Sequence, residues 1–372
     1  MSEEMKNKSI VVGRPSSLVS FVPLLVLMAL LFVTITAFGD GALSGGSQVC
    51  LLVASAVCAT IGMWVYRVPW KTFESAIEMN VKRVTEALFI LLVIGALSGM
   101  WMVSGIVPTL IYYGLQIIHP AFFLLTTCVI CAIVSLMTGS SWTTVATIGV
   151  ALIGIGQAQG YHEGWVAGAI ISGAYFGDKM SPLSDTTVLA SSTVGVRLFT
   201  HIRYLVYTTI PALAVALIVY LVAGLMLPVG SATSIELYTT ALEAHFVISP
   251  WAFVVPVLTA VMIYKRVPSL ITLFLSTVLA ALYGLLYQSE VLLALSPDAS
   301  GTMALFKSTM QAVFGETQIE MGSAELNELV ATSGMSGMMD TIWLILCAMC
   351  FGGVMESGGF LAGISRAFLK FV

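Results

Sequence analysis

The sequence predicts an all-α protein, a polytopic bundle of membrane-spanning helices. Charged residues make up 9% of the 372 positions, compared with about 25% in soluble domains. Hydrophobic residues make up 58%, the mean hydropathy is +1.00, and long apolar runs recur along the chain. Nucleic-acid binding is excluded as a function class, because the net charge is −4 and no basic patch is present to pair with phosphates.

Windows of about 18 to 20 apolar residues identify helices that cross a membrane. Seven runs have this character: residues 18–38, 48–66, 87–107, 204–227, 251–264, 270–287 and 341–360. The first run is too long for the core of a signal peptide, so we expect it to be a retained span. Between residues 108 and 203, glycine, proline, serine and threonine interrupt the apolar signal.

The positions of lysine and arginine predict the orientation, because these residues accumulate in cytoplasmic loops. If the N-terminus, residues 1–17, is cytoplasmic, every basic residue except Lys179 and Lys307 falls on the cytoplasmic side. This agreement requires an odd number of crossings between residues 108 and 203. Three crossings fit the apolar stretches 121–137, 143–156 and 164–176, which gives about ten spans. Re-entrant hairpins in place of full crossings satisfy the same charge pattern.

Two further segments are assigned outside the spans. Residues 70–86 place charged and apolar side chains on opposite faces of a helix, so we expect an amphipathic helix along the cytoplasmic interface before the third span. Residues 288–340 form the longest polar connection, and we expect a loop there.

Two oxygen-rich segments break the helical pattern between residues 108 and 203. The first is Thr-Gly-Ser-Ser-Trp-Thr-Thr at 138–144, and the second is Gly-Asp-Lys-Met-Ser-Pro-Leu-Ser-Asp-Thr-Thr at 177–187. Pro182 has no amide hydrogen to bond the carbonyl of Asp178, and it pushes Ser181 toward extended geometry. Non-helical backbone at membrane depth survives only where it is buried in protein or lines a cavity. The sequence therefore predicts discontinuous helices that meet inside the bundle.

The second break holds three charged residues, Asp178, Lys179 and Asp185, each of which costs roughly 2.5 to 3.5 kcal/mol at membrane depth. The surrounding hydroxyl and carbonyl oxygens suit a hard cation. The candidate ion-binding residues are Asp178, Asp185, Ser181, Ser184, Thr186, Thr187, Ser140, Ser141, Thr143 and Thr144, with a sodium ion at Asp178 and Asp185. The supporting residues are Lys179, Pro182, Gly177, Gly139 and Glu356, the last as a second membrane carboxylate.

Structural explanations exist for the same residues. Serine and threonine cap or bend membrane helices, and Lys179 could form a salt bridge with an aspartate that holds the break together. The ionic explanation adds a mechanism, because a desolvated carboxylate binds either a proton or a sodium ion but not both well. We assign Asp178 as the exchanging carboxylate and Asp185 as its coordinating or network partner. Lys179 would neutralise one of them when the ion is absent.

At these residues the chain resembles a known family. The runs SLMTGSSWTTVATIGVALIGIG, GAIISGAYFGDKMSPLSDTTVLASS and HIRYLVYTTIP, with GALSGMWMVSGIVPTLIYYGL at 95–115, are similar to the NhaC-type sodium:proton antiporters. This branch of the ion transporter superfamily also includes sodium-lactate/malate exchangers. The similarity runs from about residue 70 onward. It implies a multi-pass plasma-membrane exchanger with inverted repeats that transports sodium and protons and needs no cofactor.

A repeated tetrapeptide predicts how the repeats are placed. Met-Val-Ser-Gly at 102–105 recurs as Met-Glu-Ser-Gly at 355–358. If these mark two repeats, residues 87–203 form the core of the first repeat with the ion site, and residues 341–372 begin the second. The counterpart of the ion site would then lie beyond Val372, so we expect the second repeat to be incomplete. We expect residues 1–372 to form one membrane transporter domain.

Two other functions were weighed. An intramembrane aspartyl protease also needs two membrane aspartates, but it draws them from two helices, whereas here one broken segment supplies both; we expect no enzyme. A sodium- or proton-coupled lactate/malate antiporter is the nearer alternative, although the core has no arginine to clamp a carboxylate. The expected partners are the lipid bilayer, sodium ions and protons, with no nucleic acid, and a homo-oligomer is left open.

Overall fold

The computed structural model describes residues 15–182, 184, 186–187, 190–191, 196–227, 232–265, 267–297 and 300–369. These residues are nearly all helical, and their one β feature is an isolated bridge between Thr317 and Thr332. The all-α prediction is confirmed. The chain divides into two compact units, Met1–Phe89 with Met338–Val372, and Ile90–Gly337.

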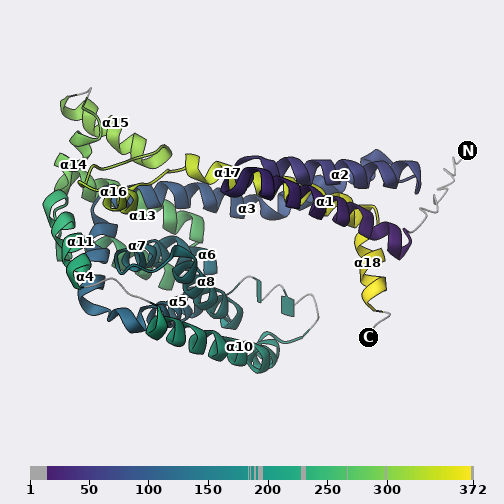
Figure 1. The fold of residues 1–372 in the computed structure, drawn as a ribbon, viewed down its shortest axis with the longest axis horizontal. Helices are drawn as coiled ribbons and strands as arrows, with labels where there is room; N and C mark the ends of the chain where they lie inside the picture. Colours follow the sequence, from purple (N-terminus) through teal and green to yellow (C-terminus); the bar gives the residue numbers. More distant parts are fainter. Residues whose placement is uncertain are drawn as a thin grey trace, which may run out of the picture. The chain divides into compact units, whose positions relative to one another are not determined.

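The first unit gathers helices from both ends of the chain. Its helices are α1 (Ser17–Phe38), η1 (Gly39–Ser44), α2 (Gly46–Trp64), the first part of α3 (Trp70–Val103), α17 (Met339–Ser357) and α18 (Phe360–Phe368). The helices α1 and α17 both pack on α2 (Figure 1). Small buried residues such as Ala54 and Cys58 on α2 leave room for this close packing.

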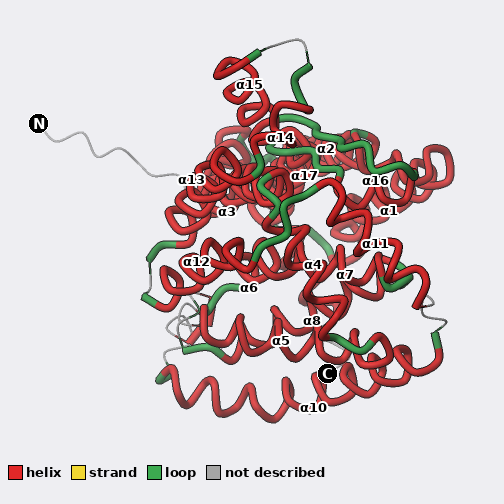
Figure 2. Tube along the Cα trace, turned by 90° about the vertical axis from the view of Figure 1, so that its left-hand side faces the viewer, coloured by secondary structure: helices red, strands yellow, loops and turns green. Residues whose placement is uncertain are grey.

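The second unit contains the interrupted region of the sequence. Its elements are the end of α3, α4 (Ile106–Ile117), η2 (Pro120–Phe122), α5 (Phe123–Thr138), α6 (Ser141–Thr144), the π-helix η3 (Val145–Gly149), α7 (Val150–Ala158), α8 (Glu163–Met180), α10 (Leu198–Met226), α11 (Ala232–His245), η4 (Pro250–Phe253), α12 (Val254–Tyr264), α13 (Ser269–Tyr287), α14 (Ser289–Ala294), α15 (Gly301–Phe314), α16 (Ala324–Val330) and, across its boundary, η5 (Ser336–Met338). Within it, α5 lies against α8, and α10 lies along both (Figure 2).

The helices are of the length and composition that a membrane protein requires. In the described part of the chain, eight helices are long and apolar enough to cross a bilayer. The number is nine if the bent pair 236–245 and 250–264, which is either a broken span or a re-entrant loop, is counted as one span. The helix α8 is also 18 residues long, but it carries Glu163, Asp178 and Lys179. A polytopic helical membrane bundle is therefore confirmed. The tenth predicted span, residues 164–176, falls in α8, which is not among these helices, so the count of about ten spans stays a prediction.

The amphipathic segment 70–86 is not a separate helix. It is the first part of α3, which continues without interruption for 34 residues. At 1.5 Å per residue this helix is about 51 Å long, more than the roughly 30 Å of a hydrocarbon core. The charged residues of the segment therefore lie on a continuous helix that is longer than one crossing requires.

The expectation of a loop over residues 288–340 is wrong. This segment forms the helices α14, α15 and α16, and the bridge between Thr317 and Thr332 closes a hairpin around α16. Leu326, Leu329 and Val330 on α16 are buried. Their spacing of three and four residues places them on one helical face. The polar residues between them lower the mean hydropathy of the segment, so this apolar face is not apparent from the mean.

The two repeated tetrapeptides adopt similar backbone conformations. After α3 the chain turns at Gly105, with φ of +74°, and α4 begins at the next residue. After α17 it turns at Gly359, with φ of +75°, and α18 begins at the next residue. Each is a helix–glycine–helix turn. The tetrapeptides align Gly105 with Gly358, whereas the glycine with positive φ is the next residue, Gly359. The inverted repeat stays a prediction.

Candidate cation site

The first oxygen-rich break is the turn of a helical hairpin. At the base of the hairpin, Gln159 Nε2 donates to the carbonyl of Ile118 at 3.1 Å, and the Tyr161 hydroxyl donates to the carbonyl of Pro120 at 3.0 Å. The beginning of α5 and the end of α7 therefore lie together. At the opposite end, α5 stops at Gly139, whose φ of +69° reverses the chain.

The helix α8 packs closely along the α5 arm. Gly173 and Gly177, one helical turn apart, face α5, and a Cβ at Gly177 would lie 2.5 Å from the backbone nitrogen of Leu136 and 2.7 Å from Ser135 Cβ. Small residues at this spacing let membrane helices approach until their backbones touch. The Ser135 hydroxyl also donates to the carbonyl of Ala174. Gly177 thus places the end of α8 beside the hairpin turn.

This packing brings the two breaks together. Ser141, the first residue of α6, donates its hydroxyl proton to Asp178 Oδ2 at 2.8 Å. The Asp178 side chain belongs to α8, and the residue is 8% exposed. A buried carboxylate held by a hydroxyl from a second break is the central feature of the candidate site.

The other hydroxyls of the hairpin turn are bonded within the turn. Ser140 caps α6, because its Oγ accepts from the Thr143 amide at 3.2 Å and from Thr143 Oγ1 at 3.0 Å. Thr144 Oγ1 donates to the carbonyl of Ser140 at 3.0 Å, and Thr143 and Thr144 are both buried. These residues perform the capping that a structural explanation gives them. The hydroxyl oxygens of Thr143 and Thr144 can still offer a lone pair to a cation, whereas Ser140 Oγ must first release one of the two hydrogen bonds that it accepts.

The second break follows the geometry that Pro182 imposes. The helix α8 ends at Met180, and Ser181 is extended, with φ of −78° and ψ of 129°. The carbonyl of Asp178 is not left open, because it accepts from the Ser181 amide at 3.2 Å and from Thr187 Oγ1 at 3.4 Å. Thr187 Oγ1 also lies 3.1 Å from the carbonyl of Lys179. One hydroxyl therefore covers two carbonyl oxygens that a cation could use.

The remaining residues of the second break are divided between core and surface. Ser181 and Ser184 are buried, whereas Pro182 and Thr186 are exposed. The hydroxyls of Ser184 and Thr186 are hydrogen-bonded to each other at 2.8 Å. Asp185 lies outside the described residues.

Lys179 forms no ion pair with Asp178. Its side chain is exposed, and its ammonium lies 4.8 Å from the centre of the Tyr175 ring. In the part of the chain that the structure describes, Lys179 forms no ion pair, so the salt bridge expected with an aspartate is absent for Asp178. Lys179 instead faces the groove between α8 and α10.

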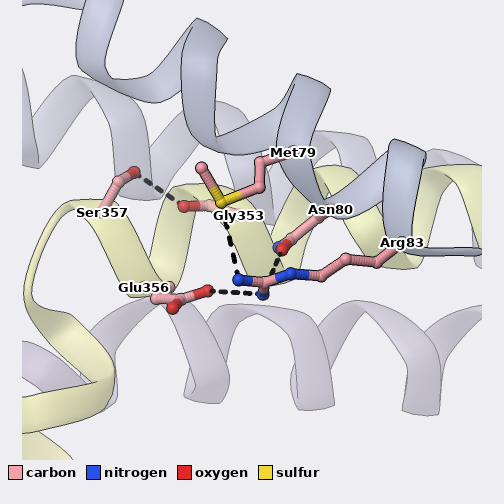
Figure 3. A network of polar contacts seen from close by, with 6 residues as sticks. All are labelled: Met79, Asn80, Arg83, Gly353, Glu356 and Ser357. Carbon is pink, nitrogen blue, oxygen red and sulfur yellow. Dashed lines mark hydrogen bonds and ion pairs between the residues drawn. The ribbon is translucent and has the colours of Figure 1, made fainter.

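Glu356 belongs to the first unit, and its partner there is a cation. Arg83 Nη1 lies 3.9 Å from Glu356 Oε2 and donates to Asn80 Oδ1 at 3.1 Å (Figure 3). Both charged side chains are more than half exposed, and exposed ion pairs contribute only about 0 to 1 kcal/mol. The geometry gives Glu356 an ion-pair partner on α3, which the sequence analysis did not identify.

Two contacts of the site were missed in the sequence. Ser135 lies one helical turn before the hairpin turn and ties α5 to α8, and its only signal is a hydroxyl in an otherwise apolar run. Thr187 was assigned to the site, but its bonds to carbonyls at the end of α8 depend on how the chain folds back after Pro182.

The fold and the site together define a class of protein. A hairpin and a broken helix that converge on a buried carboxylate, in a bundle of apolar helices, are characteristic of secondary transporters. Residues 173–372 match the model of the Na+/H+ antiporter family. The chain belongs to this family.

Curated relatives agree with this assignment. The chain is 39% identical to the Na+/H+ antiporter NhaC of Alkalihalophilus pseudofirmus over 311 residues, 84% of this chain and 63% of that protein. It is 38% identical to the malate-2H+/Na+-lactate antiporter of Bacillus subtilis over 304 residues, which are 81% of this chain and 62% of that protein. It is 32% identical to an uncharacterized Na+/H+ antiporter of Haemophilus influenzae over 363 residues, which are 96% of this chain and 74% of that protein.

The chain thus spans less than two thirds of the length of the first two relatives. No solved structure matches it significantly. The relatives are named as antiporters, not as enzymes.

Proposed function

We propose that this chain acts in the exchange of sodium ions for protons across a plasma membrane. The observation that supports this most directly is the bond between the Ser141 hydroxyl and the Asp178 carboxylate at 2.8 Å. It joins two helix breaks at a carboxylate that is shielded from water. A carboxylate in such a place needs a counter-ion or a proton, because an isolated buried charge is costly.

Exchange follows from this requirement. With sodium bound, Asp178 is ionised, and the Ser141 hydroxyl still donates to its carboxylate, because a hydrogen bond of this kind stabilises the charged form. With sodium absent, a proton on Asp178 removes the buried charge. Because each ion disfavours the other at one carboxylate, a change of access between the two sides moves sodium and protons in opposite directions.

The other ligands come from the two breaks. We assign oxygen ligands to Ser140, Thr143 and Thr144 at the hairpin turn, and to Ser181, Ser184, Thr186, Thr187 and Asp185 after α8. Thr187 already covers the carbonyls of Asp178 and Lys179, so a small rotation of this hydroxyl gives sodium access to them. The scheme needs no cofactor. From the positions of lysine and arginine in the sequence, we infer that the N-terminus is cytoplasmic.

Proton movement in everted bacterial membrane vesicles tests the proposal. Vesicles that contain the chain are acidified by respiration, and sodium chloride is then added while a pH-sensitive dye reports the internal pH. We expect sodium to raise the internal pH, and vesicles without the chain to show no response. Because the relatives are longer, the same assay is run on a form joined after Val372 to the remaining segment of the Alkalihalophilus protein. Absence of a sodium response in both forms would contradict sodium:proton exchange.

A second candidate function is exchange of organic anions, favoured by the 38% identity to the malate-2H+/Na+-lactate antiporter. Vesicles loaded with labelled malate separate the two functions. Outward lactate- and sodium-dependent malate flux would support the organic-anion exchanger. Sodium-dependent proton movement that is unaffected by either anion supports the plain antiporter.

A further inference from the structure

A groove of about 300 Å³ lies between α8 and α10, on a different face of α8 from Asp178. Its α8 wall is Ser172, Tyr175, Phe176 and Lys179, which share one helical face, and α10 supplies the opposite wall. The two helices pack against each other, and α10 lies at the edge of the second unit (Figure 2). The ion-exchange scheme does not use this groove.

One end of the groove is cationic. The Lys179 ammonium lies over the Tyr175 ring at 4.8 Å and forms no ion pair within the described part of the chain. Thr208 and Thr209 of α10 also line the groove, and the Thr208 hydroxyl donates to the carbonyl of Leu205 at 3.1 Å. A lysine ammonium binds phosphate as a point charge.

The middle of the groove is apolar, and its far end is closed by a hydrogen bond between α8 and α10. Phe176, Ala212 and Leu213 line its middle. Beyond them, the hydroxyls of Ser172 and Tyr220 are hydrogen-bonded to each other at 2.8 Å. Ser172 precedes Lys179 by seven residues, which is about 10 Å along a helix. The groove therefore fits an anion with an apolar body of about this length behind its charge.

The position of the groove favours the lipid bilayer as the source of such an anion. The 18 residues of α8 extend about 27 Å, close to the thickness of a hydrocarbon core, and Lys179 is in the last turn. Its long side chain can carry the ammonium toward the headgroups while the neighbouring Asp178 stays buried among protein side chains. The helix α10 exposes Val215, Ile218 and Val219, as a lipid-facing helix does. Arg203, near the start of α10, adds positive charge at the same end as Lys179.

We propose that the groove binds an anionic phospholipid, with the headgroup phosphate at Lys179 and part of one acyl chain along Phe176 and Leu213. Basic pockets between membrane helices bind anionic headgroups in this way. The phosphate offsets the positive charge of Lys179, which is adjacent in sequence to Asp178 and otherwise disfavours a second cation there. Binding of the lipid does not depend on transport.

Lipid retention measured by native mass spectrometry tests this site. The purified chain in neutral detergent is mixed with equal amounts of dioleoyl phosphatidylglycerol and dioleoyl phosphatidylcholine. We expect the wild type to retain the anionic lipid preferentially, and Lys179→Gln to lower that retention about fivefold, the effect of one lysine near a membrane surface. Lys265→Gln, which removes an exposed lysine outside the groove, is the matched control.

A second pair of variants tests the groove without changing the charge. Ala212→Phe fills the apolar middle, whereas Ala214→Phe adds the same bulk to α10 outside the lining. We expect only Ala212→Phe to lower retention, with all variants eluting as monodisperse protein. Equal retention by the wild type and Lys179→Gln, or equal effects of the two phenylalanines, would overturn the proposal. So would displacement of phosphatidylglycerol by glycerol 3-phosphate at equal concentration, because a free phosphate ester would then be sufficient.

Discussion

Replacing Asp178 by asparagine is expected to abolish sodium-dependent proton movement. Asparagine keeps the shape of the side chain and can still accept a hydrogen bond from the Ser141 hydroxyl, now 2.8 Å from Oδ2. It can neither carry the charge that binds sodium nor take up a proton near neutral pH. The vesicle assay with sodium chloride measures the loss, and the response should fall to that of vesicles without the chain.

Asp340→Asn is the matched control for this change. Asp340 lies in the first turn of α17 in the first unit and is exposed. We expect this variant to keep the sodium response of the wild type. Sodium-dependent proton movement at wild-type rates in Asp178→Asn would remove Asp178 as the exchanging group.

A single methyl group at Gly177 is expected to separate α8 from the hairpin. In Gly177→Ala the new Cβ meets the backbone of α5 at Leu136 and the side chain of Ser135. Backbone cannot rotate away, so the helices must move apart, and overpacking of this kind typically costs about 1 to 3 kcal/mol. We expect a lower unfolding temperature, reported by a thiol dye that reacts when buried cysteines such as Cys128 and Cys131 become exposed. The sodium response should fall with it, because Ser141 and Asp178 no longer meet.

Gly168→Ala is the comparison for Gly177→Ala. Gly168 lies on the same helix, and a Cβ there meets only the Tyr220 hydroxyl, at 3.3 Å. A flexible hydroxyl can adjust, so this variant should unfold close to the wild-type temperature. Equal stability of Gly177→Ala and Gly168→Ala would show that the α5–α8 contact does not hold the site.

The sequence predicted both helix breaks because each has a local cause. Pro182 cannot donate the next helical hydrogen bond, and the structure ends α8 at Met180 with Ser181 extended. Gly139 adopts a positive φ that other residues rarely adopt, and α5 ends there. Causes that act within a few residues can be recognised in one sequence without knowledge of the packing.

The contact between the two breaks could not be predicted in the same way. Ser141 was one of several hydroxyls assigned to the site, and nothing in the sequence distinguished it from Ser140 or Thr143. The bond to Asp178 depends on the distance between α5 and α8, which Gly173 and Gly177 set through contacts with residues some 40 positions earlier. The pairing of Arg83 with Glu356 likewise joins helices from opposite ends of the chain.

Helix geometry alone could have predicted that the Lys179 side chain points away from the hairpin turn. Consecutive residues of an α-helix point about 100° apart, so Lys179 and Asp178 cannot both face the hairpin turn. From charge alone, Lys179 was expected to pair with one of the two aspartates, Asp178 or Asp185. The structure turns Lys179 toward Tyr175 and the groove beside α10.

Sodium binding to the purified chain, measured with the wild type, Ser141→Ala, Asp178→Asn and the double variant, tests the central claim most directly. Loss of the Ser141 hydroxyl should weaken sodium binding at least about tenfold, since a hydrogen bond to a charged group contributes about 1.5 to 3 kcal/mol. If Ser141 acts through Asp178, removing the hydroxyl from Asp178→Asn should change nothing further. The account predicts this non-additive result. A further tenfold loss in the double variant, or unchanged sodium affinity in Ser141→Ala, would contradict it.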